Sequence, residues 1–293
     1  MSFLDHIRAC NNYAPARAVP LLAGNDRIGL VRRDNAEALR QFPDVFAVEQ
    51  DRVILLARGD VPTVSAAVDE VVEALVAENR VPKWRNETFD VALRWGAPPV
   101  FRLDRGAVPF FGTRAYGVHL NGYRRDGANL ELWIGRRAPD KKVAPNKLDN
   151  IVAGGIGNGH GLEETLLKEG EEEASLPTSL TRNSVPVGAV SYRMETELGI
   201  RDDVLFVYDL EMPADCVPHN QDGEIVRFEL MSAADVLERV RTTEDFKFNV
   251  NLVMLDFAVR HGVLRPGDPE YLDAATGLHR PLDWGETPPT PAH

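Results

Sequence analysis

The chain has few cysteines, no excess of basic residues and no long apolar run. Its 293 residues include two cysteines, Cys10 and Cys216, which lie far apart in the sequence. Sparse cysteine favours a reducing compartment, and the sequence leaves a disulfide between the two open. Lys and Arg number 33 against 45 Asp and Glu, which gives a net charge of −12. Because nonspecific binding to nucleic acid or to an anionic membrane depends on positive charge, this balance argues against both partners.

The N-terminus and the hydropathy pattern predict a cytoplasmic protein. The first residues, Met-Ser-Phe-Leu-Asp-His, lack the basic segment and apolar run of a signal peptide. The sequence also lacks an apolar run of about 18 residues, the length that a membrane-spanning helix requires. A hydrophobic content of 44% allows an ordinary core, and the length leaves room for two domains.

Glutamate is concentrated in residues 163–173, which contain six glutamates and one lysine. Like charges three and four residues apart on a helix repel one another, so this segment costs stability unless something offsets the repulsion. At about 3.6 residues per turn, Glu169, Glu172 and Glu173 share one helix face. Hard oxygen ligands in that arrangement suit Mg²⁺ or Mn²⁺. The alternative interpretation is a solvated acidic face, the usual explanation of charge runs.

Gly170, in the middle of the predicted helix, indicates close packing. A glycine at such a position costs about 0.8–1 kcal/mol relative to alanine, and contact with another element explains it best. Leu162 and Leu166 fall on the same side of the helix, which marks that side as buried. Lys168 lies four residues from both Glu164 and Glu172, so it can orient either carboxylate.

The residues before this helix strengthen the metal interpretation. Residues 148–155 read Leu-Asp-Asn-Ile-Val-Ala-Gly-Gly, a turn and a short apolar segment that end in a glycine pair. More glycines follow, and then the helix. The whole segment resembles the Nudix box, the metal-binding loop–helix–loop of the Nudix hydrolases. This resemblance implies that Glu169, Glu172 and Glu173 are metal ligands and that the cofactor is Mg²⁺ or Mn²⁺.

The segment departs from the Nudix pattern at several positions. The family arginine is Lys168, the closing glycine is Ser175, and the apolar residue after the arginine–glutamate pair is Gly170. The loop before the helix is shorter than usual, and the early glutamate of the pattern falls on His160 or Gly161. These differences bear on the number of metal ions more than on metal binding itself.

A second resemblance is to one Nudix subfamily. It rests on the shortened box, on residues 117–123 (Gly-Val-His-Leu-Asn-Gly-Tyr) and on residues 84–87 (Trp-Arg-Asn-Glu). Members of this subfamily carry an extra N-terminal domain and are similar to the Nudix part attached to some fungal thiamine pyrophosphokinases. The resemblance covers residues 1–265. It implies hydrolysis of thiamine diphosphate, or of its oxidised analogues, to the monophosphate.

Periodicity and turn signals predict an α+β chain. We expect a smaller α+β domain over residues 1–112, the Nudix domain over 113–265 and a tail over 266–293. The resemblance implies an α/β/α sandwich with a mixed sheet for the second domain. Besides the glutamate-rich helix, the expected helices are 3–10, 35–42, 62–76, 233–240 and 250–262, and the expected strands are 18–23, 27–33, 45–49, 52–57, 115–125, 130–137, 185–193, 204–211 and 225–231.

Three residues outside the box are further candidates for the site. Glu224 follows a Gln-Asp-Gly turn and begins a strand. The resemblance implies that it completes the metal shell or acts as the base, and the alternative is a surface acid. Trp84 and Arg85 lie in a segment rich in proline and aromatics, and they could stack on a heterocycle and clamp phosphate. The alternative is that Trp84 and Trp95 bury apolar area between the domains.

These residues predict metal-assisted hydrolysis of a small-molecule diphosphate. Metal held by the three glutamates polarises phosphoryl oxygens and lowers the pKa of a bound water. One of the glutamates, or Glu224, takes the proton of that water, and Lys168 orients the carboxylates. Gly154 and Gly155, expected in a loop, let backbone amides approach the phosphates.

Three functions compete on the sequence alone. The first is a Nudix pyrophosphohydrolase that acts on a thiamine diphosphate-like substrate, or on a nucleoside diphosphate linked to another group. The second is isomerisation of a diphosphate on the same fold, for which Cys216 is a weak candidate. The third is a non-catalytic sensor of a phosphorylated metabolite, and the presence of all the metal glutamates argues against it. A helix-turn-helix pattern with a basic face is lacking, and a homodimer is left open.

Overall fold

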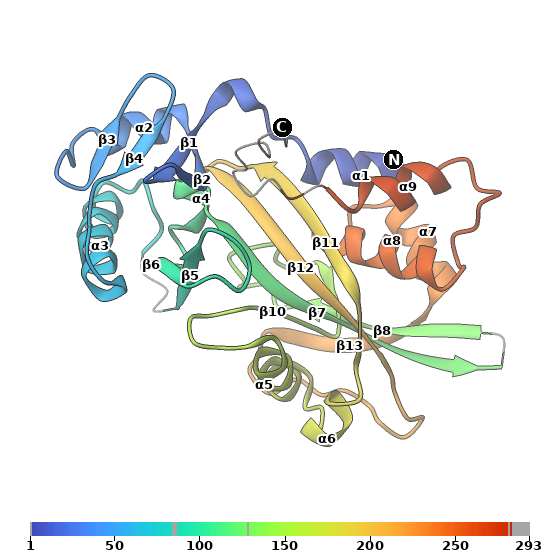
Figure 1. The fold of residues 1–293 in the computed structure, drawn as a ribbon. Coiled ribbons are helices and arrows are strands. Elements are labelled where there is room, and N and C mark those ends of the chain that lie inside the picture. The colour runs from blue at the N-terminus through green and yellow to red at the C-terminus, as the bar shows by residue number, and fades with distance from the viewer. Residues whose placement is uncertain (1, 84–86, 128, 281, 283–293) are drawn as a thin grey trace, which may run out of the picture.

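The computed structural model describes residues 2–83, 87–127, 129–280 and 282. Figure 1 shows a smaller unit, which we call the N-terminal unit, beside a larger unit built on a seven-stranded sheet, which we call the sheet unit. The N-terminal unit comprises the short 3-10 helix η1 (Pro15–Arg17), strands β1 (Ala18–Ala23), β2 (Asp26–Arg32), β3 (Phe46–Val48), β4 (Val53–Leu55), β5 (Thr88–Ala92) and β6 (Pro99–Asp104), and helices α2 (Arg33–Leu39), α3 (Val61–Ala77) and α4 (Val108–Phe111).

The N-terminal unit is a four-stranded sheet with helices and a separate hairpin. The sheet has the order β2-β1-β4-β3, in which β1 and β4 run parallel and the other pairs run antiparallel. Helix α3 begins where the Asp60 side chain accepts a hydrogen bond from the Thr63 amide (3.0 Å). Pro62 occupies its first turn, where a missing N–H is no loss. Apolar residues at helical spacing form its buried face: Val64, Val68, Val71, Val72 and Leu75.

The sheet unit is organised around one long strand. Its strands are β7 (Arg114–Asp126), β8 (Asn129–Arg137), β9 (Leu148–Asp149), β10 (Val152–Gly155), β11 (Val185–Glu195), β12 (Ile200–Glu211) and β13 (Ile225–Ser232). The order is β11-β12-β7-β8-β13, and the sheet is mixed because β12 runs parallel to β7. The other edge of β7 is shared, since β10 pairs with residues 117–120 and β8 pairs with residues 123–126. Strand β10 therefore pairs with the part of this β7 edge that β8 does not cover.

Helices cover both faces of this sheet. Helices α5 (Leu162–Ala174) and α6 (Thr178–Thr181) lie on one face, and α7 (Ala233–Thr242) and α8 (Val250–Arg260) lie on the other (Figure 1). Helices α1 (Phe3–Cys10) and α9 (Tyr271–Gly277) pack against α8. The result is the expected α/β/α sandwich with a mixed sheet, preceded by a smaller α+β unit.

The expected helices and strands are found, with ends shifted by a few residues. The structure adds elements that the sequence reading did not name, among them the hairpin β5–β6, strands β9 and β10, and helix α9 within the expected tail. Phe3 and Ile7 of α1 share one hydrophobic cluster with Ala274 and Leu278 near the other end of the chain. Both ends of the described chain thus contribute to the core of the sheet unit.

The two units meet where the segment after α4 touches β2. The Leu30 amide donates to the Gly112 carbonyl (3.0 Å), and the Asn35 side chain donates to the carbonyls of Leu198 (2.8 Å) and Phe110 (3.2 Å). Gly112 has a φ of 60°, and a Cβ added there would lie 1.8 Å from the Leu30 carbonyl oxygen. Close approach of two backbones requires glycine at this position.

Replacement of Gly112 by alanine should therefore destabilise the protein by roughly 3 kcal/mol, since a left-handed backbone and a steric clash add together. Gly24→Ala is a matched control, because Gly24 also has a positive φ (64°) but no atom lies within 4 Å of the added Cβ. The control should lose only about 1–2 kcal/mol. Urea unfolding measures both changes, and equal losses in the two variants would contradict the importance of the contact.

Candidate active site

Helix α5 carries the glutamates and is closed at its C-terminal end by Ser175. The Ser175 amide donates to the Glu171 carbonyl (3.1 Å), and the Leu176 amide donates to the Gly170 carbonyl (2.9 Å). These bonds satisfy carbonyls that the helix end leaves without partners. Ser175 has a φ of 53°, a left-handed conformation that glycine adopts at less cost. The closing glycine of the Nudix pattern is therefore replaced here without loss of the turn.

Gly170 packs against helix α6, as its position in the sequence predicted. It is buried, and a Cβ added there would lie 3.3 Å from the side chain of Thr181. Leu166 is buried in the cluster beneath the helix, and Leu162 packs against that cluster. These contacts orient α5 so that its glutamate face turns toward β10.

The three predicted ligands occupy different depths on that face. Glu173 is buried, and its carboxylate accepts a hydrogen bond from the Ala153 amide in β10 (2.8 Å). Glu169 is mostly buried, whereas Glu172 is exposed. Lys168 Nζ lies 3.5 Å from a carboxylate oxygen of Glu169 and 3.5 Å from one of Glu172. Lys168 thus bridges two of the three glutamates, as its spacing predicted for Glu172.

The three glutamates carry more negative charge than the single neighbouring lysine can balance. Burial raises the pKa of Glu173 well above its usual range, and the charges of Glu169, Asp149 and Glu224 add to the effect. Burial also raises the pKa of Glu169, although Lys168 opposes the shift. Since one lysine cannot neutralise this many carboxylates, a bound cation would lower the free energy of the ionised site.

The donor set fits a divalent cation by its chemistry. Carboxylate oxygens at three depths on one helix face are hard ligands of the kind that Mg²⁺ and Mn²⁺ accept. Within the described residues, no group of three or more His, Cys, Asp or Glu side chains stands close enough to hold a metal by itself. Mg²⁺ commonly keeps several waters and takes further oxygens from substrate phosphates, so an all-protein cage is not required.

The glycine pair does not lie in a loop, and this expectation was wrong. Gly154 and Gly155 are the last residues of β10, opposite Val118 and Gly117 of β7. A Cβ on Gly154 would lie 2.4 Å from Cγ of Glu169. Gly154 is needed because helix α5 approaches the strand there, and Gly155 is needed because the Phe89 ring approaches it.

Glu224 lies near the glutamates although it comes from another part of the sheet. It directly precedes β13, and its carboxylate is 2.5 Å from Lys141 Nζ. Its charge contributes to the raised pKa of Glu173. Trp84 and Arg85, the other two candidates, lie outside the described residues.

The hairpin β5–β6 of the N-terminal unit contacts the box. The Asn158 amide donates to the Thr88 carbonyl (2.7 Å), and a Cβ on Gly155 would lie 2.7 Å from Cζ of Phe89. The charge of Glu87 raises the pKa of Glu169. The N-terminal unit therefore forms a wall beside the candidate site, and Glu87 was visible in the sequence only as part of the segment 84–87.

A buried polar network lies close to β10. Asp149 is buried and forms ion pairs with Arg137 (2.8 Å) and Lys247 (3.2 Å). Burial alone would raise the pKa of Asp149, but these two cations outweigh it and the pKa is lowered. Asn150 donates a side-chain hydrogen bond to Asn121 (2.7 Å), which donates in turn to Asp209 (2.9 Å).

His119 joins this network and is buried. Its Nδ1 lies 2.8 Å from the Asn150 side-chain oxygen, and it is almost fully buried. Burial, reinforced by the charge of Lys247, lowers the pKa of His119 to about 4. Because an ordinary histidine would be partly protonated near pH 6.5, the fold holds this ring in its neutral form.

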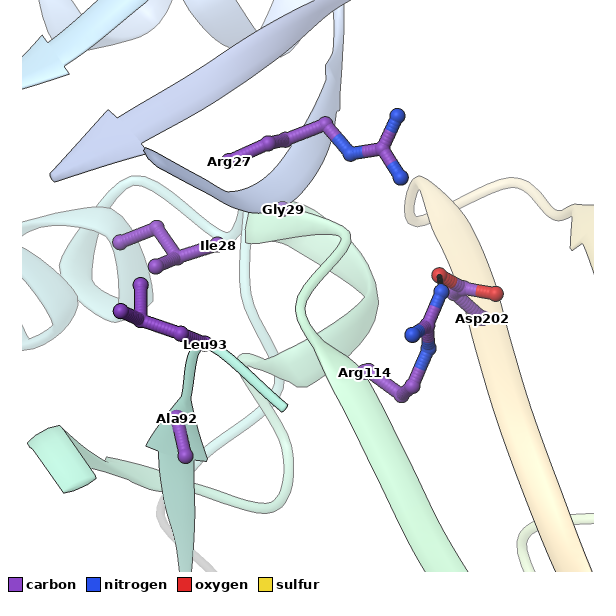
Figure 2. Close-up of a pocket in the computed structure, with 7 residues that line it drawn as sticks. All are labelled: Arg27, Ile28, Gly29, Ala92, Leu93, Arg114 and Asp202. Carbon is purple, nitrogen blue, oxygen red and sulfur yellow. Dashed lines mark hydrogen bonds and ion pairs between the residues drawn. The ribbon is translucent and has the colours of Figure 1, made fainter. Parts of the chain in front are cut away.

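The cavity drawn in Figure 2 is too small for a substrate. It lies between β2, the end of β5, and the ends of β7 and β12, and its volume is about 20 Å³. Such a volume holds about one water molecule. The side chains of Arg114 and Asp202 point toward one another in Figure 2 and form an ion pair (2.9 Å). This cavity belongs to the seam between the two units.

The chain matches two protein families, one in each part. Residues 2–115 match a family described as a domain of unknown function, DUF4743, and residues 116–251 match the NUDIX domain. The chain is 39% identical over 286 residues to Nudix hydrolase 20 of Arabidopsis thaliana, covering 92% of this chain and 76% of that protein. It is also 39% identical over 290 residues to Nudix hydrolase 24 of the same plant, covering 97% and 78%.

These matches extend over the N-terminal and the Nudix parts alike, and the chain belongs to the Nudix hydrolase family. It is a Nudix-type pyrophosphohydrolase, an enzyme that acts on a small-molecule substrate. A crystal structure of a Deinococcus radiodurans protein is similar to it with a TM-score of 0.46 and 24% identity, covering 57% of this chain and 97% of that one. Within the part of the chain that the structure describes, no helix is long and apolar enough to span a membrane.

The buried neutral histidine predicts a loss of stability in acid. The unfolded chain binds a proton at His119 between pH 6.5 and about 4 that the folded protein does not. The free energy of unfolding is therefore unaffected by His119 above pH 6.5 and decreases as the pH falls from 6.5 to about 4. At about 1.4 kcal/mol per pKa unit, the loss is on the order of 3 kcal/mol.

Urea unfolding at several pH values between 4 and 7 measures how steeply the free energy of unfolding changes with pH. We call this change the pH slope. His119→Gln should flatten it, because the titrating ring is removed while a hydrogen-bonding side chain remains. His219→Gln removes an exposed histidine and should leave the slope as in the unmodified protein. A slope unchanged by His119→Gln would assign the acid sensitivity to other groups.

Proposed function

We propose that this Nudix hydrolase cleaves the pyrophosphate bond of a small organic diphosphate, such as thiamine diphosphate or its oxidised analogues, and that the reaction depends on Mg²⁺ or Mn²⁺. The observation that carries the proposal is the glutamate face of α5. Glu173 is buried and Glu169 mostly buried beside β10, with one bridging lysine to balance them. The substrate class rests on the subfamily resemblance described above.

The glutamates and Lys168 are proposed to position the reacting groups. Glu173 is held by the Ala153 amide, and Lys168 holds Glu169 and Glu172 in a fixed relation. When bound at these carboxylates, a divalent cation supplies polarisation of the phosphoryl oxygens and a water of lowered pKa. One of the glutamates or Glu224 takes the proton of the attacking water.

The chemistry is a hydrolysis that balances without any further reactant. The water oxygen forms a bond to phosphorus, and the bridging phosphorus–oxygen bond breaks. The proton leaves the water for a carboxylate oxygen, and the products are an organic monophosphate and inorganic phosphate. Gly154 and Gly155 are proposed to meet the substrate phosphates with backbone atoms alone, because the space that their side chains would need is taken by Glu169 and Phe89.

The cellular setting is also a proposal. Both described cysteines are free thiols, as expected in a reducing compartment such as the cytoplasm. The two Arabidopsis relatives are described as chloroplastic, which is a statement about those proteins. A homodimer is compatible with this proposal and is not required by it.

Glu172→Gln is expected to reduce Mg²⁺-dependent turnover by roughly 10²-fold or more, because it removes a charged oxygen at the reacting phosphate. The fold should persist, since the side chain is exposed. Glu171→Gln is the matched control, with the same change of charge on the next residue of the same helix. Mn²⁺ binding, followed by electron paramagnetic resonance, should weaken in Glu172→Gln and not in Glu171→Gln. Equal turnover and equal Mn²⁺ binding in the two variants would show that Glu172 is not a metal ligand.

A substrate panel tests the class of molecule that is hydrolysed. Phosphate release with and without Mg²⁺ is measured for thiamine diphosphate, its oxidised analogues, nucleoside diphosphates and nucleoside diphosphates linked to a second group. We expect the highest kcat/KM for the thiamine-like compounds. A preference for a linked nucleoside diphosphate would replace this substrate class by the alternative that the sequence left open.

A further inference from the structure

Three aromatic rings from three separate elements meet beside the candidate active site. Trp95 lies in the connection between β5 and β6, Tyr116 lies on β7, and Phe206 lies on β12. The centroid of the Trp95 ring is 4.6 Å from that of Tyr116 and 4.8 Å from that of Phe206. These distances are within the range of favourable aromatic contact. We call this group the aromatic platform.

The platform is not a closed packing cluster. Trp95 retains 42% of its accessible surface, although the sequence reading offered burial between the domains as one explanation for it. Tyr116 and Phe206 are only partly buried. A tryptophan that is held by two rings on one side and remains open to solvent offers a surface on which another ring can stack.

Strand register places the platform next to the glutamate helix. Tyr116 directly precedes Gly117, the residue opposite Gly155, and the Tyr116 carbonyl accepts a hydrogen bond from the Ile156 amide (2.9 Å). Phe206 stands opposite Val118, which lies in the hydrophobic cluster beneath α5. Because side chains alternate along a strand, Tyr116 and Val118 project from the same face. The platform therefore lies on the face of the sheet that α5 covers.

The same hairpin supplies both the exposed ring and the wall of the site. Its strand β5 contacts the box through Thr88 and Phe89, and three residues after β5 ends the chain reaches Trp95. The short segment after β5 thus links the position of Trp95 to the position of Gly155. Tyr116 and Phe206 also pack against the hydrophobic cluster that contains Leu166 of α5, which places the platform beside the helix that carries the glutamates.

We propose that Trp95, Tyr116 and Phe206 form the subsite for the organic part of the substrate and that this part is a planar aromatic heterocycle. The inference deepens the proposed function and rests on it. The diphosphate lies at the glutamate face, and the ring stacks on the platform. The N-terminal unit completes the substrate site of the Nudix domain by supplying Trp95.

The chemistry of the platform fits a neutral or cationic ring. The faces of tryptophan and tyrosine attract cations and stack on heterocycles regardless of their substituents. Burial raises the pKa of Tyr116 to about 12, so its phenol is uncharged at neutral pH and does not repel an electron-rich ring. Arg114 interacts with Tyr116 and is itself paired with Asp202 (2.9 Å), so the anionic groups of the ligand are assigned to the metal face.

The experiment compares ligands that differ in the ring, in enzyme variants that differ in one platform residue. Thiamine diphosphate and ADP carry a heterocycle, whereas methyl diphosphate carries none. In the full-length protein with Mg²⁺, Trp95→Ala should raise KM for the ring-bearing substrate by roughly tenfold or more, with kcat little changed. Methyl diphosphate should be used equally by both proteins. Trp95→Phe should recover most of the loss because it restores a ring.

Leu272→Ala serves as the matched control, since it also truncates an exposed large apolar side chain, on α9. This variant should leave KM unchanged both for the ring-bearing substrate and for methyl diphosphate. Phe206→Leu tests the platform a second time by removing a ring while keeping an apolar side chain of similar size. Thermal unfolding of each variant shows whether the fold is retained.

Direct titration of the ligands into the protein separates this inference from the proposed function. Weaker binding of a ring-bearing ligand to Trp95→Ala supports the platform even if no diphosphate is hydrolysed. An unmodified protein that binds ring-bearing and ringless diphosphates equally would overturn the inference while leaving hydrolysis in place. An equal change for both kinds of ligand in Trp95→Ala would also overturn it.

Discussion

The contact between helix α5 and strand β10 is the constraint on which the candidate site depends. A buried carboxylate needs a hydrogen-bond donor, and Glu173 finds one in the Ala153 amide. The helix can come this close only because Gly154 presents no side chain to Glu169. Gly170 of the same helix packs against Thr181, 3.3 Å from where its Cβ would lie. Two glycines therefore set the position of a helix whose charges oppose its burial.

The strand that receives these glutamates is itself supported by buried polar groups. Strand β10 pairs with the stretch of β7 that contains His119, and the chain just before β10 carries Asp149 and Asn150. Arg137 and Lys247 balance the charge of Asp149, and hydrogen bonds continue from Asn150 through Asn121 to Asp209. A satisfied network of this kind restricts the strand to one position. Negative charge is thus balanced around Asp149, whereas the glutamates of α5 keep an excess of it.

The N-terminal unit contacts the Nudix box in this chain. Contacts at Thr88 and Phe89 tie hairpin β5–β6 to the box, and the charge of Glu87 reaches Glu169. At the other end of the seam, Gly112 lets the backbone approach β2. The extra domain is therefore joined to the sheet at several points rather than through a single linker. A site that spans two units can take its specificity from both.

Local patterns in the sequence were enough to predict the longer helices, most strands and the identity of the box. Periodicity identified α3, and the spacing of Glu169, Glu172 and Glu173 placed them on one helix face, because helix geometry depends on near neighbours alone. The role of Gly170 followed from the cost of glycine within a helix. The different depths of the three glutamates, the place of Gly154 and Gly155 in a strand, and the neutrality of His119 depended on residues far away in the chain. Only the tertiary structure decided these features, because burial and charge balance arise from contacts between distant segments. The meeting of Trp95, Tyr116 and Phe206 has the same origin, since no spacing within one element brings two strands and a loop together.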